Sequence, residues 1–458
     1  MMNDKKWGSF MEAPKIKVNP PGPISSEMLK VQEHLETASR SYTKIFRTAF
    51  DYGKNATLVD MDGNVFIDLF AGVSVINLGH GNPEVIEAIK KQTDKLTHIT
   101  EVPTESRISF LKTLDSTLPG KMRGKSKIFT TVTGGDACEL AIQMARFITG
   151  KKVIVAFGGS YHGIAGNIVS TTANPHYREY SGNDYINTYH LPYPYPYRFP
   201  QKVEPEEMSK IVAEDLENLI TDPYSGTGGI AGVIVEPVQG EGGYIVPPEN
   251  FLPLLREVTE KHNVPLIVDE VQTGIGRTGK IWASEHYNVT PDIMTISKSV
   301  GGGIPISMIA YNQDYDMDLP SGFHLGTYRA NPLGLAAGNI ILQKLKNENF
   351  MKDVQKKGQY VMDRLSKLQE KNKYIGDVRG LGFMIGVEFV KNKETKEPFG
   401  EMAQKIKSEM FNRGVLIHTC GHYANVIRFM APLTIEQQLL DKSLDIFAGV
   451  VDNISKSN

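Results

Sequence analysis

The sequence predicts an α/β fold in which helices cover both faces of a mostly parallel sheet. Short apolar runs alternate with helical segments between about residues 79 and 332, a pattern typical of strands buried between two helical layers. The composition, 40% hydrophobic and 22% charged, is that of an ordinary globular protein, so disorder is not expected. The length of 458 residues favours two or three domains with a dry interior.

Residues 1–60 are expected to form an N-terminal arm and part of a small domain. The Pro-Pro-Gly-Pro run cannot continue a helix or join the interior of a sheet, so Pro14 to Pro23 is predicted to be extended. Ser25 or Ser26 is expected to cap the next helix, which runs to about Ser39. Leu58 to Phe70 has the pattern of a hairpin that turns at Asp62-Gly63.

Residues 61–332 are expected to form the large domain. The strand Lys127 to Thr133 leads through two glycines into a helix from Asp136 to Thr149. Further strands are predicted at Val153–Phe157, Gly232–Glu236, Pro265–Asp269, Ile293–Ser297 and Pro305–Ala310, and a helix at Glu249–His262. In such sheets, ligands bind at the carboxyl ends of the strands.

Residues 333–458 are expected to form a C-terminal small domain together with the N-terminal segment, because neither piece alone has a convincing core. The chain is strongly helical to about Gln369 and again from Glu436 to about Ile454. Between these helices, strands are predicted at Phe383–Phe389, Val415–Thr419 and Val426–Met430.

Charge and cysteine content exclude several kinds of partner. With 50 Lys+Arg against 52 Asp+Glu and no long basic run, neither nucleic acid nor an anionic membrane is an expected partner. Apolar runs end well before the roughly 18 residues of a membrane span, and Met1 to Met11 lacks the apolar core of a signal peptide. Cys138 and Cys420 stand alone, which predicts no disulfide framework, no zinc or other metal site, and a reducing, cytoplasmic location.

Two charged residues follow neighbouring apolar strands. Asp269 ends the run Val264 to Val268, and Lys298 follows the run Asp292 to Ile296. Strand ends often meet solvent, so one such residue alone carries little information. The pair is expected to lie at the same rim of the sheet, which makes that rim the candidate reaction site.

The stretches around this pair, Val268-Asp-Glu-Val-Gln272 and Ser297-Lys-Ser-Val-Gly-Gly-Gly303, resemble the signature of the class III aminotransferases, which use pyridoxal phosphate. The resemblance runs from about residue 50 to the C-terminus, and Asn425 to Thr434 is similar to the 4-aminobutyrate aminotransferase branch. It implies pyridoxal-phosphate fold type I, with a mostly parallel seven-stranded sheet in the large domain and a smaller α+β domain. It also implies a homodimer or a dimer of dimers, with shared active sites.

The resemblance assigns roles at the cofactor ring. Lys298 matches the lysine that forms a Schiff base with the cofactor aldehyde and later moves the substrate proton. Asp269 matches the carboxylate that keeps the pyridine nitrogen protonated. Gln272 matches the residue that hydrogen-bonds the ring hydroxyl, with Glu236 as its support. Tyr161 and His162 match the aromatic platform, in which Tyr161 stacks on the ring.

The cofactor phosphate is expected at a helix N-terminus, where main-chain N–H groups and the helix dipole favour an anion. Gly134 and Gly135, between a strand and a helix, match this position. The family more often has Gly-Ser here, so Gly135 lacks a hydroxyl contact. Thr327 matches a threonine that binds phosphate across the subunit boundary.

Four further residues match substrate-binding positions: Arg428, Glu241, Val73 and Arg329. Arg428 resembles an arginine that binds the α-carboxylate of a glutamate-like donor and otherwise pairs with Glu241, while Val73 resembles an apolar residue of the substrate pocket. The 4-aminobutyrate enzymes have an arginine directly after Tyr-His-Gly, but this chain has Ile164, so a bidentate carboxylate partner is missing. Arg329 is a candidate substitute, and its position is also similar to the diaminobutyrate branch.

The expected activity is therefore ping-pong transamination between an ω-amino acid or related amine, 4-aminobutyrate-like or diaminobutyrate-like, and a 2-oxo acid such as 2-oxoglutarate or pyruvate. The alternative is a pyridoxal-phosphate-dependent amino-acid racemase or epimerase of the same family, because some of these also lack the arginine at position 164. A nucleotide-binding module is a third interpretation, but the glycine turn lacks G-x-G-x-x-G and such a module has no need of Lys298 opposite Asp269.

Overall fold

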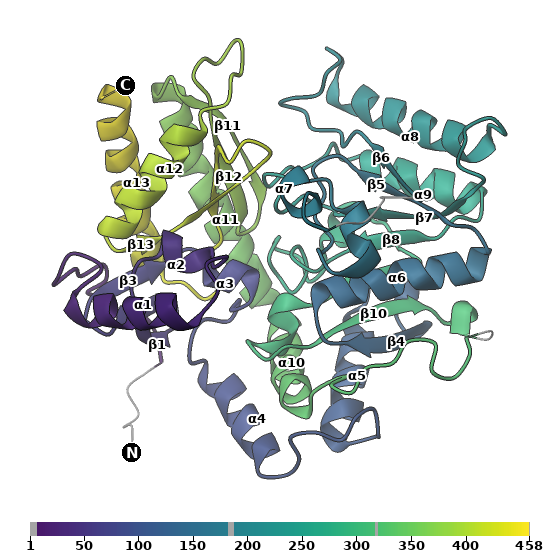
Figure 1. Cartoon of the computed structure of the whole chain (residues 1–458), viewed down its shortest axis with the longest axis horizontal. Coiled ribbons are helices and arrows are strands. Elements are labelled where there is room, and N and C mark those ends of the chain that lie inside the picture. The colour runs from purple at the N-terminus through teal and green to yellow at the C-terminus, as the bar shows by residue number, and fades with distance from the viewer. Residues whose placement is uncertain (1–6, 182–186, 317–318, 458) are drawn as a thin grey trace. The chain divides into compact units, whose positions relative to one another are not determined.

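The computed structural model describes residues 7–181, 187–316 and 319–457 and divides into two compact units (Figure 1). The large unit comprises Glu87–Asp353, and the small unit comprises Met1–Ile86 with Val354–Asn458. The boundaries therefore fall later than those expected at residues 60 and 332. The first moves because the strands of the N-terminal hairpin pair with strands of the small unit, and the second because the helix after Pro332 packs against a helix of the large unit.

Seven strands form the described sheet of the large unit, in the order β4-β10-β9-β8-β7-β5-β6 (Figure 1). Their bounds are Ser126–Thr131 (β4), Val153–Phe157 (β5), Thr188–Leu191 (β6), Ile230–Val235 (β7), Leu266–Asp269 (β8), Ile293–Ile296 (β9) and Ser307–Asn312 (β10). β10 runs antiparallel to both of its neighbours, whereas the pairs from β9 to β6 are parallel. The predicted mostly parallel sheet is confirmed, and β6 is a strand that the sequence analysis did not predict.

Alternate residues of the central strands enter two different cores, as the two-residue period of a strand requires. Val155 and Val233 pack with helices α8 (Pro205–Thr221) and α9 (Phe251–Lys261). Ile154 and Ile234 pack on the opposite face with α6 (Gly134–Thr149). Apolar side chains therefore cover both faces of the central sheet.

The large unit contains further helices besides those that cover the two faces of the sheet. They are α5 (Glu105–Thr117), α7 (Pro175–Arg178) and α10 (Pro332–Leu345), with α4 (Pro83–Thr93) and α11 (Glu348–Lys371) crossing into the small unit, and the short 3₁₀ turns η1 (Gly120–Met122), η2 (Gly166–Thr171), η3 (Ala283–His286), η4 (Lys298–Gly301) and η5 (Gln313–Asp316). α5 and α10 pack against each other.

The small unit contains two four-stranded sheets in its described part, ordered β1-β2-β3-β13 and β11-β12-β15-β14. The strands are Phe50–Lys54 (β1), Thr57–Asp60 (β2), Val65–Asp68 (β3), Ile375–Leu381 (β11), Met384–Phe389 (β12), Val415–Leu416 (β13), His418–Cys420 (β14) and Val426–Phe429 (β15). The predicted single strand Val415–Thr419 is wrong, because the chain leaves one sheet at Ile417 and enters the other. An unbroken apolar run does not reveal such a change of sheet.

The N-terminal predictions are confirmed only in part. Residues 14–22 lie outside helices, and Lys15 pairs with Val65. Helix α1 (Pro23–Leu35) ends earlier than the expected Ser39. The predicted cap at Ser25 or Ser26 is wrong, because the helix already begins at Pro23, after Gly22, which makes no side-chain cap hydrogen bond. The remaining helices of the small unit are α2 (Tyr42–Ile45), α3 (Ala71–Ser74), α12 (Gly400–Asn412) and α13 (Gln437–Lys456). None of the helices in the described residues has the length and apolar character needed to span a bilayer.

Candidate active site

A cavity of about 200 Å³ lies at the carboxyl ends of the central strands of the large unit. Its lining residues come from the turns that follow β4, β5, β7, β8 and β9: Gly134, Gly135, Tyr161, His162, Gly163, Glu236, Glu241, Asp269, Val271, Gln272, Ser297 and Lys298. Nine of the predicted site residues therefore converge on one cavity: Gly134, Gly135, Tyr161, His162, Glu236, Glu241, Asp269, Gln272 and Lys298. This convergence follows from parallel strands presenting their ends at one rim.

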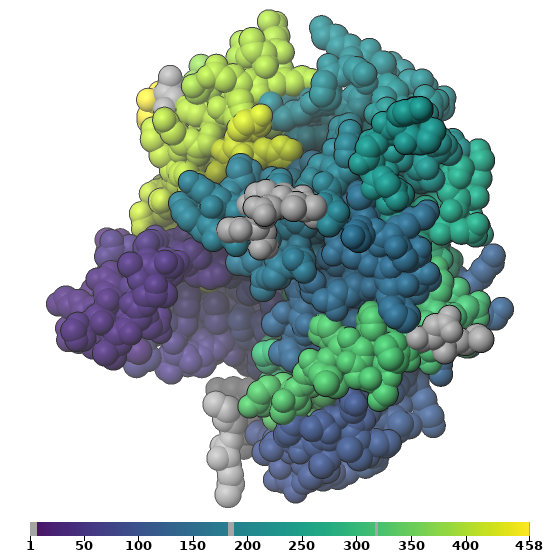
Figure 2. Space-filling model, turned by 45° about the vertical axis from the view of Figure 1, so that its right-hand side comes forward, coloured from purple at the N-terminus to yellow at the C-terminus, as the bar shows by residue number. Residues whose placement is uncertain are grey.

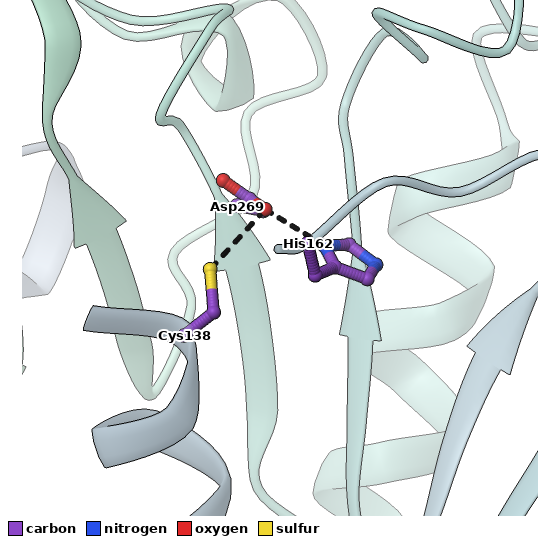
Figure 3. Close-up of side chains that lie close together, drawn as sticks. All are labelled: Cys138, His162 and Asp269. Atoms are coloured by element: carbon purple, nitrogen blue, oxygen red, sulfur yellow. Dashed lines mark hydrogen bonds and ion pairs between the residues drawn. The ribbon is translucent and has the colours of Figure 1, made fainter. Parts of the chain in front are cut away.

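Asp269 is the most densely hydrogen-bonded side chain of the cavity. Its Oδ2 atom accepts hydrogen bonds from His162 Nδ1 at 2.7 Å and Cys138 Sγ at 3.4 Å (Figure 3). Its Oδ1 atom accepts from Val271 N at 2.9 Å and Thr295 Oγ1 at 3.0 Å. Burial alone would raise the pKa of Asp269, but its hydrogen bonds and the His162 charge outweigh burial and lower the pKa. The side chain is therefore held as a buried anion.

Lys298 stands at the start of η4, two residues after β9 ends. Its backbone is left-handed, with φ of +50°, a conformation that costs a non-glycine residue of order 1–3 kcal/mol. Such strain persists only where the surrounding structure enforces it, and it is concentrated at functional sites. Lys298 lines the same cavity as Asp269, so the cavity offers an amine and a carboxylate in one buried space.

Glu236 follows β7 and binds two main-chain N–H groups. Its Oε1 accepts from Tyr161 N at 3.0 Å, and its Oε2 accepts from Gly240 N at 2.8 Å. Burial raises the pKa of Glu236 to about 7. Glu236 is linked to Gln272 through Gly240. The backbone of Gly240 lies so close to the Gln272 side chain that a Cβ atom on Gly240 would be 2.6 Å from Gln272 Oε1. By binding Gly240 N, Glu236 therefore holds this glycine against the Gln272 amide.

Gly134 and Gly135 open α6, where the first main-chain N–H groups have no carbonyl partner within the helix. The Thr133 side chain caps the helix by accepting from Asp136 N. A Cβ atom on Gly134 would lie 2.8 Å from Val271 Cγ1, whereas one on Gly135 would meet its nearest neighbour, Gly163 Cα, at 3.5 Å. Only the first position therefore requires glycine for space.

Thr327 and Arg329 do not line this cavity. Thr327 is exposed, and the green segment after residue 318 lies on the surface in Figure 2. Arg329 is only 2% exposed. Its guanidinium contacts His324 Nδ1 and lies 5.0 Å from the centre of the Phe129 ring.

Val73 lies in the small unit, within a left-handed turn. Residues 71–74 all have positive φ, including +60° at Val73, which is a true outlier for a β-branched residue. The turn is held by Asp68, whose Oδ1 accepts from Phe70 N and Ala71 N, both at 2.8 Å. Asp68 Oδ2 lies 2.8 Å from His80 Nε2.

Arg428 lies on β15 of the small unit and is only 2% exposed. It stands opposite His418 in the antiparallel register, with Nη2 3.3 Å from His418 Nδ1. The His418 ring stacks on Phe70 at 5.7 Å. Since Arg428 and Glu241 belong to different units, their pairing stays a prediction.

Sequence reasoning missed two neighbours of Asp269. Cys138 was considered only as a disulfide or zinc candidate, yet it is free and buried beneath Asp269. Its place on α6, four residues after Gly134, is visible in the sequence but carries no motif. Thr295 was missed because it lies inside a strand. Cys138, His162 and Asp269 offer ligand atoms within 4.8 Å of one another, but Asp269 already accepts hydrogen bonds from the other two (Figure 3).

Four features of the cavity fit pyridoxal phosphate. His162 Nε2 and Gln272 Oε1 are buried polar atoms that have no hydrogen-bond partner among the described residues. The amino end of α6 suits a phosphate group, and the buried Asp269 anion suits a protonated ring nitrogen. A strained lysine on the same cavity supplies an amine for an aldehyde. These features define a pyridoxal-phosphate enzyme of the transaminase type.

Comparison with known proteins agrees with this class. The family model of the class-III aminotransferases matches residues 37–451, and the chain belongs to this family, whose cofactor is pyridoxal phosphate. A diaminobutyrate–2-oxoglutarate aminotransferase of Rhizobium meliloti is 34% identical, with 93% of this chain and 92% of that protein covered.

Two further relatives show how diverse the matches are. An alanine/serine racemase of Pyrococcus horikoshii is 35% identical, with 96% of this chain and 93% of the racemase covered. A solved (S)-enantioselective omega-transaminase from Thermomicrobium roseum is 29% identical and superposes with a TM-score of 0.85, covering 94% and 98% of the two chains. The fold type is thus shown, while the matches carry both transaminase and racemase names.

Proposed function

We propose that the protein is a transaminase that moves the amino group of an ω-amino acid or a diamino acid to a 2-oxo acid such as 2-oxoglutarate or pyruvate. The observation that carries this proposal is the pairing, in one cavity, of a strained Lys298 with the buried Asp269 anion. A lysine can accept and return a proton, and a buried anion can hold a positive charge opposite it.

The side chains of the cavity have separate roles in binding the cofactor and in moving the substrate proton. When bound, the cofactor supplies an electron-accepting ring. Asp269 would hold the proton on the ring nitrogen, because its negative charge is stabilised by four donors. Gln272 would hydrogen-bond the ring hydroxyl, and Tyr161 would stack on the ring. The amides of Gly134 and Gly135 would bind the phosphate, and Lys298 Nζ would move the proton of the substrate carbon.

The charge of the cavity supports a donor with a second amine. Its described lining includes Glu236, Glu241 and Asp269 but no arginine, and Ile164, where the 4-aminobutyrate enzymes have an arginine, is 51% exposed. A distal carboxylate on the donor therefore has no guanidinium partner in this lining, whereas a distal ammonium has the Glu241 carboxylate as an acidic neighbour. We assign the α-carboxylate of the substrate to Arg428 and the apolar wall of the substrate pocket to Val73.

We further propose that the protein acts in the cytoplasm as a homodimer. Two free, buried cysteines suit a reducing compartment. Thr327 is exposed, as are the neighbouring apolar side chains of Leu325 and Tyr328, at 78% and 68%, and apolar surface of this kind favours contact with a second copy. In that dimer, Thr327 would bind phosphate in the partner's site. Arg329 is buried two residues further along the same loop, and we assign it to binding of the substrate.

A donor screen tests this activity. The purified protein should consume 2,4-diaminobutyrate with 2-oxoglutarate or pyruvate, and 4-aminobutyrate should react more weakly. Lys298→Ala should abolish turnover and the lysine-dependent absorbance of the bound cofactor, while Lys280→Ala, at an exposed lysine, should change neither. If one enantiomer of an amino acid is converted to the other without any 2-oxo acid, and no amino group is transferred, the racemase alternative is correct.

A further inference from the structure

Cys138 contacts the carboxylate of Asp269, which lines the cofactor cavity, but Cys138 does not itself line the cavity. It lies on α6, four residues after Gly134 and therefore about one turn into the helix that opens at the cavity. Its side chain is fully buried. The Sγ atom lies 3.4 Å from Asp269 Oδ2 (Figure 3). It also lies 3.5 Å from Thr295 Oγ1. Burial raises the pKa of the Cys138 thiol well above its usual value, so the group keeps its proton and can donate it.

The four donors to Asp269 come from different parts of the large unit. Val271 follows the same strand as Asp269, Thr295 lies on the neighbouring strand β9, and His162 lies in the turn after β5. Cys138 is the only one of these four that lies on α6. It therefore joins the helix whose first amides face the phosphate end of the cavity to the carboxylate that faces the ring nitrogen.

We propose that Cys138 is a positioning residue that donates its S–H hydrogen bond to Asp269 and thereby sets the spacing between the helix that binds the cofactor phosphate and the carboxylate that binds the ring nitrogen. The cofactor is a rigid ring with a short phosphate arm, so this spacing decides whether both ends bind together. The inference rests on the proposed function, because it takes the cofactor to lie between these two groups.

Three substitutions separate hydrogen bonding from packing. Cys138→Val removes the donor at similar volume, whereas Cys138→Ser keeps a donor at smaller volume. Cys420→Val is the matched control, since Cys420 is also a free, buried cysteine but lies in the small unit on β14. The dissociation constant of the cofactor should rise about fivefold in Cys138→Val, the factor that corresponds to one net hydrogen bond. It should stay within about twofold in Cys138→Ser and Cys420→Val.

Infrared spectroscopy gives a second measurement that does not depend on activity. In the Cys420→Ala background, Cys138 is the only thiol, and S–H stretching falls where other protein groups do not absorb. The band should lie at the lower frequency of a hydrogen-bonded thiol and move upward in Asp269→Asn, because the charged acceptor is removed.

The two measurements decide the proposal together. Equal loss of cofactor affinity in Cys138→Val and Cys138→Ser would overturn it in favour of packing, and an S–H band at the unbonded frequency would overturn it directly. If Asp269→Asn does not fold, the cofactor dissociation constants of Cys138→Val and Cys138→Ser still test the proposal, because only the valine variant should bind the cofactor more weakly. A failure of the proposed function would appear differently, as an unchanged cofactor absorbance in Lys298→Ala.

Discussion

Replacing Asp269 by asparagine should slow removal of the substrate proton by about two to three orders of magnitude. The Asp269 side chain is 3% exposed and held as an anion by four donors. A buried opposite charge raises the pKa of a neighbouring cation by about 1–3 units, and each unit is worth about 1.4 kcal/mol. Because Asp269 is deeply buried, we expect the loss of transition-state stabilisation to lie at the upper end of this range, about 3–4 kcal/mol. That energy corresponds to a rate slower by about two to three orders of magnitude.

The assay is a single-turnover half-reaction with an α-deuterated amino donor, followed through the absorbance of the bound cofactor. Glu270→Gln is the matched control: Glu270 is the next residue, is equally buried, and instead accepts hydrogen bonds from Thr273 Oγ1 and Ser284 N. The control should keep most of its rate. A rate in Asp269→Asn within about threefold of the parent, with cofactor bound, would refute the assigned role of this carboxylate.

Three further predictions concern other parts of the chain. Arg428→Ala should slow the glutamate half-reaction far more than the reaction of an amine without an α-carboxylate; equal losses in the two stopped-flow assays would contradict carboxylate binding. Gly135→Ser should tighten cofactor binding about fivefold, because the Cβ atom fits at 3.5 Å and the hydroxyl adds a phosphate donor; weaker binding in equilibrium dialysis would speak against the phosphate site. Burial raises the pKa of Glu236 from 4.5 to about 7. The free energy of unfolding should therefore keep the full contribution of Glu236 below pH 4.5, where the side chain is protonated in both states. It should fall by roughly 3 kcal/mol as the pH rises through about 7. Urea unfolding should show this decline in the parent but not in Glu236→Gln, and identical pH profiles would rule it out.

The sequence predicted the fold class because buried parallel strands leave a strong local signal. Continuous apolar runs such as Val153–Phe157 can only be covered on both faces, and this strand was predicted with its exact bounds. The family, the class of enzyme and the cofactor were likewise predicted from two short stretches and are confirmed. Strand β6 was not predicted, because Thr188–Leu191 is short and partly polar.

The site was predictable where a residue type is required by chemistry at a strand end, as for Asp269 and Lys298. It was not predictable where the contact depends on packing between distant elements. Nothing in the sequence brings Cys138 beneath Asp269, since the contact depends on how α6 lies across β8 and β9. The indirect path from Glu236 through Gly240 to Gln272 likewise exists only in three dimensions. The role of each residue in catalysis stays a prediction until it is measured.

The left-handed turn at residues 71–74 has a practical consequence for protein engineering. We propose that Val73 lines the substrate pocket, and the backbone at this position, with φ of +60°, restricts which replacements can fold. Glycine, asparagine and aspartate tolerate this backbone best. A library restricted to these three, with valine retained as the parent, would therefore sample altered substrate ranges with fewer misfolded clones than full randomisation.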